Sequence, residues 1–389
     1  MSETSCAHVA PHLTVQKRAR VIAHYLPQFH PIPENDAWWG RGFTEWTNVA
    51  KAKPLYRGHY QPRVPADLGF YDLRVPETRR AQADMAREYG VEAFCYWHYW
   101  FAGKRLLEQP FNEVLRSGEP DFPFCLGWAN ATWSGVWYGA PKTILQEQTY
   151  PGMDDYKAHF EMLLEAFEDP RYLTVDGKPF FLIFRPMDLP DAKKVTDFWR
   201  ELAVKNGLKG LHIVGLLDKM DQNPNDYGLD AASLHRLDRM FRSRKMSPSA
   251  LVRKRLSHYS ITGHLMKSLS RKPIHVYPYD HVSPNFVIEE ALDYEYYPTI
   301  IPNWDNTARS GSNGVVLHGS TPELFQQHVR SAVNRVADLP PEHRIIIAKS
   351  WNEWAEGNHL EPDLRYGLAY LEALRAEIFA LGAVPAPKL

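Results

Sequence analysis

The segment Ile345-Ile346-Ile347-Ala348-Lys349-Ser350-Trp351-Asn352-Glu353-Trp354-Ala355-Glu356-Gly357 decides the fold of this chain. Its first four residues form an apolar run, which is typical of a strand that is buried on both faces. Two tryptophans and two carboxylates follow at once, and residues of this kind are poor material for a core. In parallel α/β folds, chemically active groups collect at the C-terminal ends of strands. The segment therefore indicates a parallel strand that ends in a functional site.

Other short apolar segments resemble this strand, and amphipathic segments separate them. The expected strands are Arg20 to Leu26, Val91 to Trp97, Phe122 to Trp128, Pro179 to Arg185, Leu211 to Leu217, Leu229 to His235, Tyr296 to Pro302 and Arg344 to Ser350. The expected helices are Glu77 to Tyr89, Met153 to Glu168, Asp191 to Asn206, Thr321 to Ala337 and Arg365 to Leu381. Eight buried strands that alternate with helices predict a closed (β/α)8 TIM barrel of the α/β class. The alternative is a doubly wound open sheet, but no Gly-rich phosphate turn follows the first strand.

Length and composition allow one large domain. The chain has 389 residues, of which 44% are hydrophobic and 23% charged, and single α/β barrels reach this length with loop insertions. We expect a disordered leader at 1–17 and one catalytic domain at 18–385, with an insertion at about 236–282. The aromatic-rich segment Pro31 to Arg74 is expected to be an ordered loop over the barrel mouth.

Charge and hydropathy limit the partners. The net charge of −1 gives no global field for binding nucleic acid or an anionic membrane. The basic segment Arg236 to Lys272 is either a solvated insertion or a surface for a lipid-linked or anionic glycan. The chain shows no signal-peptide pattern and no apolar stretch of membrane-spanning length, so we expect a cytoplasmic protein. The sequence leaves the oligomeric state open.

Aromatic residues stand beside Asn, Asp and Glu at several of the expected strand ends and in the loop over the mouth. Pyranoses need both kinds of group, because apolar faces cover their C–H surfaces while amides and carboxylates bind their hydroxyls. The alternative is that these aromatics only pack the core. The candidate sugar-binding residues are Tyr25, His30, Trp39, Glu45, Trp46, Tyr96, Trp97, His98, Trp100, Trp128, Asn130, Trp133, Trp304, Asp305, Asn306, Asn352 and Trp354.

Glu353 and Glu356 are the candidate catalytic residues. A carboxyl held against indole walls has a raised pKa and can donate a proton at neutral pH. An isolated Glu-x-x-Glu is more often a solvated helix face, so its position at a strand end carries the interpretation. The sequence contains no HExxH, GxSxG, P-loop or GxGxxG motif. We therefore expect neither a metal nor a cofactor. It also lacks the Asp-x-Asp pair of many nucleotide-sugar glycosyltransferases.

Several motifs closely resemble the WbsX family, whose members are similar to glycoside hydrolase family 99 and are encoded in bacterial surface-polysaccharide clusters. The resemblance covers about residues 20 to 375. The matching segments are Tyr25-Leu26-Pro27-Gln28-Phe29-His30, Trp38-Trp39-Gly40-Arg41-Gly42-Phe43-Thr44-Glu45-Trp46-Thr47-Asn48, Gly58-His59-Tyr60-Gln61-Pro62, Asp67-Leu68-Gly69 and Trp351-Asn352-Glu353-Trp354.

This resemblance implies a (β/α)8 barrel related to retaining endo-α-1,2-mannosidases and mannanases that act without metal. Their Asn-Glu-x-x-Glu-Gly pattern matches residues 352–357. By that match, Glu353 takes the proton of the substrate 2-hydroxyl, which attacks the anomeric carbon to give a 1,2-anhydro sugar. Glu356 is then the general acid and later the base.

Two observations keep other functions open. WbsX sequences usually carry a Glu after the Trp-Ala-Asn of the third strand, and this chain has Ala131 there, which puts the substrate in doubt. WbsX proteins were also named glycosyltransferases, so one alternative is a glycosyltransferase that assembles the O-antigen of lipopolysaccharide or capsular polysaccharide. A non-catalytic glycan-binding barrel is the other.

Overall fold

The structure is a computed structural model that describes residues 14–135, 140–219, 221–234 and 275–382. Its main sheet follows the order β13-β11-β10-β9-β5-β3-β2-β16-β14, and every neighbouring pair on this path is parallel. The apolar runs form these strands because a parallel strand buries both faces. The strands are β2 (Arg20–Tyr25), β3 (Val91–Phe101), β5 (Phe124–Trp128), β9 (Lys178–Ile183), β10 (His212–Leu217), β11 (Ala231–Leu234), β13 (Glu295–Tyr296), β14 (Thr299–Ile300) and β16 (Ile345–Ala348).

One strand position is divided, and this division closes the barrel. The expected strand Tyr296 to Pro302 consists of two short pieces, of which β13 pairs with β11 and β14 pairs with β16. Pro298 lies between the pieces and has no N–H for a sheet ladder, but its carbonyl accepts a hydrogen bond from the Ile347 N–H at 2.9 Å. The sheet therefore has eight strand positions and returns to its start, as predicted for a (β/α)8 barrel.

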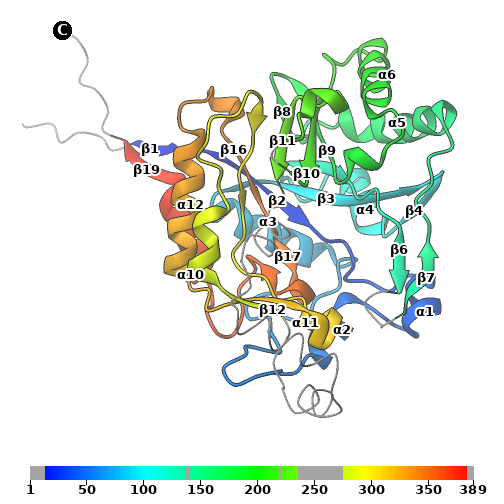
Figure 1. The fold of residues 1–389 in the computed structure, drawn as a ribbon. Helices are drawn as coiled ribbons and strands as arrows, with labels where there is room; N and C mark the ends of the chain where they lie inside the picture. The colour runs from blue at the N-terminus through cyan, green and yellow to red at the C-terminus, as the bar shows by residue number, and fades with distance from the viewer. Residues whose placement is uncertain (1–13, 136–139, 220, 235–274, 383–389) are drawn as a thin grey trace, which may run out of the picture.

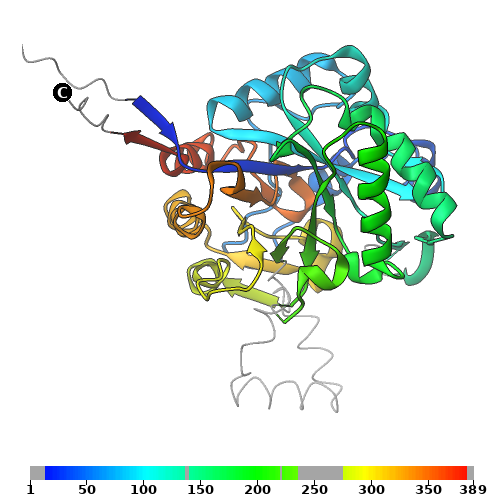
Figure 2. The ribbon, with the colours of Figure 1, turned by 90° about the horizontal axis from the view of Figure 1, so that it is seen from above.

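Helices cover the outside of the sheet (Figures 1 and 2). Thr321 caps α12 (Pro322–Val336), because its side chain accepts a hydrogen bond from the Leu324 N–H and proline occupies the first turn. Between β10 and β11 the described residues form a single helical turn, the 3-10 helix η3 (Pro224–Tyr227). The outer helices are α3 (Pro76–Glu88), α4 (Gln109–Ser117), α5 (Met153–Phe167), α6 (Ala192–Lys205), α12 (Pro322–Val336) and α13 (Ala369–Ile378).

The segment Pro31 to Arg74, which was expected to be a loop, contains two short helices. These are α1 (Pro33–Trp39) and α2 (Glu45–Lys51). The Trp46 indole N–H donates to the Tyr71 carbonyl at 2.7 Å. Trp46 also packs against Trp354 with a centroid distance of 5.6 Å, so the segment lies over the barrel mouth as predicted.

Shorter elements complete the fold. Strand β4 (Lys104–Leu106) pairs with β3, and β8 (Thr174–Val175) pairs with β9. Two further pairs are β6 (Trp133–Gly135) with β7 (Ala140–Gln146) and β17 (Asn352–Glu353) with β18 (Asn358–His359). After the sixth strand position come β12 (His275–Pro278), α10 (Tyr279–Val282), α11 (Thr307–Ser310) and β15 (Val315–His318), with β12 parallel to β15. The single-turn 3-10 helices are η2 (Pro186–Asp188), η4 (Ser283–Asn285), η5 (Gly311–Asn313), η6 (Pro341–His343) and η7 (Trp354–Glu356).

The two ends of the described chain pair with each other. Strand β1 (Thr14–Lys17) is antiparallel to β19 (Phe379–Gly382), so the last four residues of the expected leader are a strand. The expected helix Arg365 to Leu381 is shorter, because it gives way to β19 after Ile378. The basic segment Arg236 to Lys272 and residues 1–13 lie outside the described residues.

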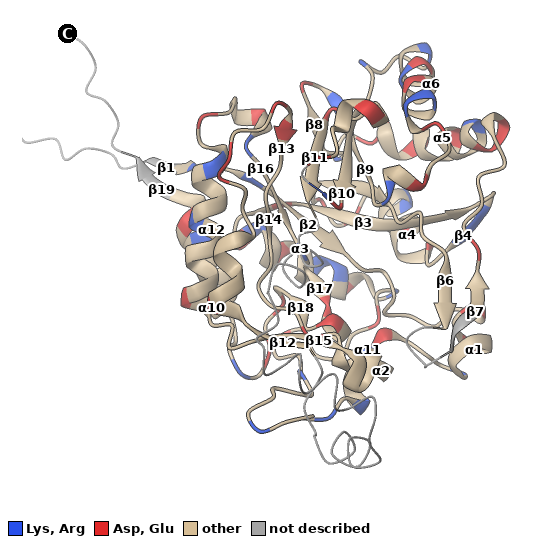
Figure 3. Cartoon of the chain, viewed as in Figure 1, with Lys and Arg blue, Asp and Glu red and all other residues tan. Residues whose placement is uncertain are grey.

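Both signs of charge mix on the outer helices, as α5, α6 and α12 show in Figure 3. Such a surface creates no single-sign field. Across the ranges that the structure describes, every helix is too short or too polar to cross a membrane.

Candidate active site

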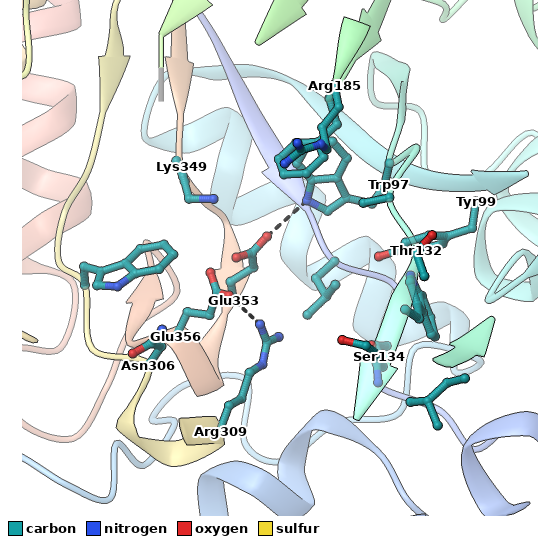
Figure 4. Close-up of a pocket in the computed structure, with 18 of the residues that line it drawn as sticks. Trp97, Tyr99, Thr132, Ser134, Arg185, Asn306, Arg309, Lys349, Glu353 and Glu356 are labelled. Carbon is teal, nitrogen blue, oxygen red and sulfur yellow. Dashed lines mark hydrogen bonds and ion pairs between the residues drawn. The ribbon is translucent and has the colours of Figure 1, made fainter. Parts of the chain in front are cut away.

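A cavity of about 490 Å³ opens at the C-terminal ends of the barrel strands (Figure 4). Both Glu353 and Glu356 line it. Trp97, Tyr99, Thr132 and Ser134 lie across from them. Of the candidate sugar-binding residues, the cavity is lined by Trp39, Trp97, Trp133, Trp304 and Asn306.

A single 3-10 turn brings the two carboxyls together. Glu353 precedes η7 and Glu356 is its last residue, and residues three apart in a 3-10 helix eclipse each other. The two side chains share a hydrogen bond. This is the local reason that a Glu-x-x-Glu spacing delivers both acids to one point of the cavity.

Glu353 is held in its ionised form. Its Oε1 accepts a hydrogen bond from the Trp97 indole N–H at 3.1 Å. Burial by itself raises the pKa of Glu353, but the positive charge of Lys349, the hydrogen bond with Glu356 and the charge of Arg309 outweigh it and lower this pKa to about 2. Glu353 is therefore a carboxylate at neutral pH.

The pKa of Glu356 is shifted in the opposite direction. Burial and the negative charge of Glu353 raise the pKa of Glu356 to about 8, although Arg309 opposes the shift. Two acids in one site cannot both ionise easily, so one keeps its proton. The pair thus offers one base and one acid at neutral pH.

Arg309 connects this pair to the loop over the mouth. It comes from α11, and its Nη1 contacts Glu356 Oε1 at 2.6 Å while its Nε contacts Glu45 Oε1 at 2.6 Å. Glu45 is 0% exposed, so this carboxylate cannot reach the cavity. It binds the arginine in place of the expected sugar.

Hydrogen bonds from Asn352 and Trp354 fix the turn that carries the carboxyls. Asn352 accepts from the Leu26 N–H at 2.7 Å and donates to the Leu26 carbonyl at 3.0 Å. The Trp354 indole N–H donates to Glu361 Oε2 at 2.6 Å, and its ring stacks on His359 at 3.8 Å. Trp354 also packs against Trp46 and does not line the cavity, so it supports the turn.

Gly357 ends the same turn in a conformation that favours glycine. Its φ is +59°, and a Cβ there would lie 2.7 Å from Arg63 Nε and 2.9 Å from the Asp305 Cβ. A left-handed residue without a side chain lets the chain reverse directly after Glu356. This explains the glycine in the Asn-Glu-x-x-Glu-Gly pattern.

Asp305 is also a supporting residue. It is buried, and its Oδ2 accepts hydrogen bonds from His59 at 2.7 Å and Gln61 Nε2 at 2.9 Å. Its backbone N–H donates to the Glu356 carbonyl at 2.6 Å. Although burial raises the pKa of Asp305, the hydrogen bond from His59 and the charge of Arg63 lower it overall. Asp305 ties the loop to the turn that carries Glu353 and Glu356.

The alternation of side chains along β3 separates its aromatic residues. Successive side chains of a strand point to opposite faces, so Trp97 and Tyr99 line the cavity while their neighbours point outward. The outward residues are Tyr96, which packs on Phe111; His98, whose Nε2 lies 2.9 Å from His159 Nε2; and Trp100, which stacks on His159 and donates to Asp155.

The remaining candidates are structural as well. Tyr25 donates to Gln82 Oε1 at 2.7 Å behind the sheet. The His30 Nδ1 lies 2.9 Å from the Pro27 carbonyl, and Trp128 packs against both His159 and Trp199. The side chain of Asn130 donates a hydrogen bond to the Arg185 carbonyl and accepts one from the Arg185 N–H. None of these four lines the cavity.

Sequence reasoning missed several cavity residues. Tyr99 shares a strand face with Trp97, so the period of two could have identified it. Arg309 lies on a four-residue helix that gave no signal. Ala131 does line the cavity, which places the departure from the family pattern at the site itself. Further lining residues that were not predicted are Gln28, Thr132, Ser134, Arg185, Asp218 and Lys349.

Among the described residues, no group of three or more His, Cys, Asp or Glu side chains is arranged to hold a metal ion.

Comparisons with known proteins agree on the family and the fold. A family model described as Glycosyltransferase WbsX matches residues 21–374. An uncharacterized protein WxcX of Xanthomonas campestris pv. campestris (strain B100) is 39% identical over 377 residues, which are 96% of this chain and 52% of that protein. Its counterpart in strain ATCC 33913 is 39% identical over 92% of this chain and 49% of that protein. The chain spans about half the length of these curated relatives.

Solved structures share the fold at low identity. The GH99 endo-alpha-mannosidase from Bacteroides thetaiotaomicron, in complex with BIS-TRIS-Propane, matches with a TM-score of 0.54 and 15% identity, over 92% of this chain and 96% of that one. A glycoside hydrolase-like protein matches with a TM-score of 0.55 and 16% identity, over 96% and 97%.

Proposed function

The chain belongs to the WbsX family, and we propose that it is a glycan-processing enzyme of the glycoside hydrolase type. Its substrate is an α-mannoside-like linkage of a bacterial surface polysaccharide, which it hydrolyses or transfers with retention. The observation that carries the proposal is the Glu353/Glu356 pair, whose pKa values move in opposite directions beside one cavity. A reaction that needs one base and one acid at once suits such a pair.

In the first step the Glu353 carboxylate takes the proton of the substrate 2-hydroxyl. The oxygen that loses the proton attacks the anomeric carbon and displaces the leaving oxygen, which takes the proton of Glu356. The products are a 1,2-anhydro sugar and the released alcohol. The Trp97 N–H orients Glu353, and Arg309 orients Glu356.

In the second step the roles reverse. Glu356, now a carboxylate, removes a proton from water, and the water oxygen attacks the anomeric carbon. The three-membered 1,2-anhydro ring opens, and the oxygen on C2 recovers its proton from Glu353. Two inversions at one carbon give net retention. A sugar hydroxyl in place of water gives transglycosylation.

The lining of the cavity supports a sugar as the ligand. Trp39, Trp133 and Trp304 supply apolar surfaces, and their number is typical of sites that bind the C–H faces of pyranoses. Thr132, Ser134 and Asn306 line the same cavity and offer groups that bind hydroxyls. We therefore expect an oligosaccharide or polysaccharide substrate.

The proposal is tested by incubating the enzyme with the surface polysaccharide of its source organism and with synthetic α-mannosides, followed by product analysis. We expect a reducing end to form and Glu356→Gln to lose about two to four orders of magnitude in turnover. Wild-type turnover by Glu356→Gln would contradict the assignment.

A glycosyltransferase is the second candidate, because the description of the matching family names that activity. The same cavity would then bind an activated sugar and an acceptor. Calorimetry distinguishes the two: binding of a nucleotide sugar or lipid-linked sugar, without hydrolysis of any glycan, favours the transferase.

A further inference from the structure

Lys349 is a buried cation at the floor of the cavity. It follows β16 directly, its backbone N–H donates to the Ile300 carbonyl at 2.9 Å, and the residue is 6% exposed. Its side chain lines the cavity together with Glu353 (Figure 4). Sequence motifs did not identify it, and the proposed reaction assigns it no step.

Among the residues that the structure describes, the ammonium group of Lys349 has an apolar contact but no ion pair. Its Nζ lies 5.1 Å from the centre of the Trp304 ring, a cation–π geometry. Within the described ranges, no carboxylate lies within 4.0 Å of it. A buried ammonium needs hydrogen-bond acceptors because its desolvation is costly. Water or a ligand bound in the cavity must supply these acceptors.

The other two cations of the cavity are already neutralised. Arg309 contacts Glu45 and Glu356, and Arg185 contacts Asp188. Lys349 instead balances Glu353 through space, without direct contact.

That balance changes during the proposed reaction. When Glu353 takes the proton of the 2-hydroxyl and Glu356 gives up its own, the negative charge moves from Glu353 to Glu356, and Lys349 then faces a neutral Glu353. A sugar hydroxyl can donate or accept a hydrogen bond there, but it cannot supply the missing charge. An anionic group on the sugar can.

We propose that Lys349 binds a carboxylate of the sugar in this cavity, so that the substrate contains a hexuronic acid. This substrate class rests on the proposed function, whereas the binding of the acidic sugar does not depend on turnover. The Trp304 ring packs against the lysine ammonium group. A uronate placed against it would also withdraw the lysine's influence from Glu353 and make that carboxylate a stronger base.

Binding tests the proposal separately from catalysis. Calorimetry compares the methyl α-glycosides of mannuronate, glucuronate and galacturonate with those of mannose, glucose and galactose. We expect at least one uronate to bind about tenfold more tightly than its neutral partner, because a buried charge pair contributes over 1.4 kcal/mol. Equal binding within all three pairs would overturn the subsite.

Variants identify the residue responsible. Lys349→Met, which keeps length and apolar volume, should abolish the preference for the uronate, and Lys349→Gln should do the same if the first variant does not fold. Arg185→Met is the matched control and should keep the preference. Retention of the preference in a folded Lys349 variant would overturn the proposal.

The outcome separates from that of the proposed function. Glu356→Gln should keep the uronate preference although it loses turnover. Preferential binding of a uronate without turnover in the wild type would contradict the hydrolase and support the acidic subsite. Turnover of neutral glycans without a uronate preference would support the hydrolase and contradict the acidic subsite.

Discussion

Arg309 contacts Glu356 with an Nη1 to Oε1 distance of 2.6 Å, at the point where the proposed reaction needs a protonated acid. The contact favours the carboxylate form, while burial and Glu353 favour the protonated form. The balance between these effects sets the pH at which the acid is lost. Because Arg309 also contacts Glu45, the balance is tied to the loop over the mouth.

Replacing Arg309 should shift the basic limb of the pH profile upward. The arginine lowers the pKa of Glu356, so its removal raises this pKa, and the acid stays protonated to higher pH. Glu45 would be left as a buried unpaired carboxylate, which costs about 3–5 kcal/mol of stability. We therefore suggest the double variant Arg309→Met/Glu45→Gln and measurement of kcat/KM against pH.

The matched control is Arg200→Met, whose guanidinium contacts Asp230 outside the cavity. Its basic limb should remain in place. A downward shift in the double variant would show that Glu356 is not the titrating acid.

The wild-type profile should be bell-shaped. Activity requires Glu353 ionised and Glu356 protonated, so it falls as the pH drops below the lowered pKa of Glu353 and as it rises above the raised pKa of Glu356. Glu356→Gln should remove the basic limb as well as the rate. Substrates with an excellent leaving group need no acid and should recover part of the lost rate. A basic limb that persists in Glu356→Gln would assign it to another group.

Trp97→Phe should lower kcat/KM by about tenfold. The substitution keeps the ring but removes the N–H that contacts Glu353, and a hydrogen bond to a charged group is worth about 1.5–3 kcal/mol. The control is Trp100→Phe, because Trp100 lies on the other face of β3 and contacts Asp155. Equal losses in both variants would mean that packing, and not the contact with Glu353, is responsible.

Asn352→Ala should destabilise the fold by about 2–3 kcal/mol, because it leaves both the N–H and the carbonyl of Leu26 without their buried partner. Urea denaturation measures the change. Asn206→Ala, which loses only an exposed contact to the Leu202 carbonyl, should cost less than about 1 kcal/mol. A similar loss in both would contradict the supporting role of Asn352.

The barrel could be predicted from the sequence because apolar runs such as Ile345–Ala348 mark buried parallel strands directly. The split at Pro298 was missed, since it depends on which strand each half pairs with. The cavity lies at the strand ends, where the sequence predicted a site. The sequence did not predict which side chains at those ends line the cavity. Tyr25 and His98 are adjacent in sequence to cavity-facing residues and point away from it.

Long-range partners account for the other misses. Glu45 looked like a sugar ligand because it stands in an aromatic-rich loop, yet it contacts an arginine 264 positions away. Lys349 looked like the end of a strand, and only the folded arrangement places its ammonium in the cavity. Contacts of this kind are set by tertiary packing and leave no local pattern.

The central claim is that Glu353 acts on the 2-hydroxyl and does not attack the sugar itself. The direct measurement is intact-protein mass spectrometry after incubation with the 2-deoxy-2-fluoro analogue of an activated glycoside that the enzyme turns over. We predict no covalent adduct, because the attacking oxygen is missing. A glycosyl adduct mapped to Glu353 would contradict the account.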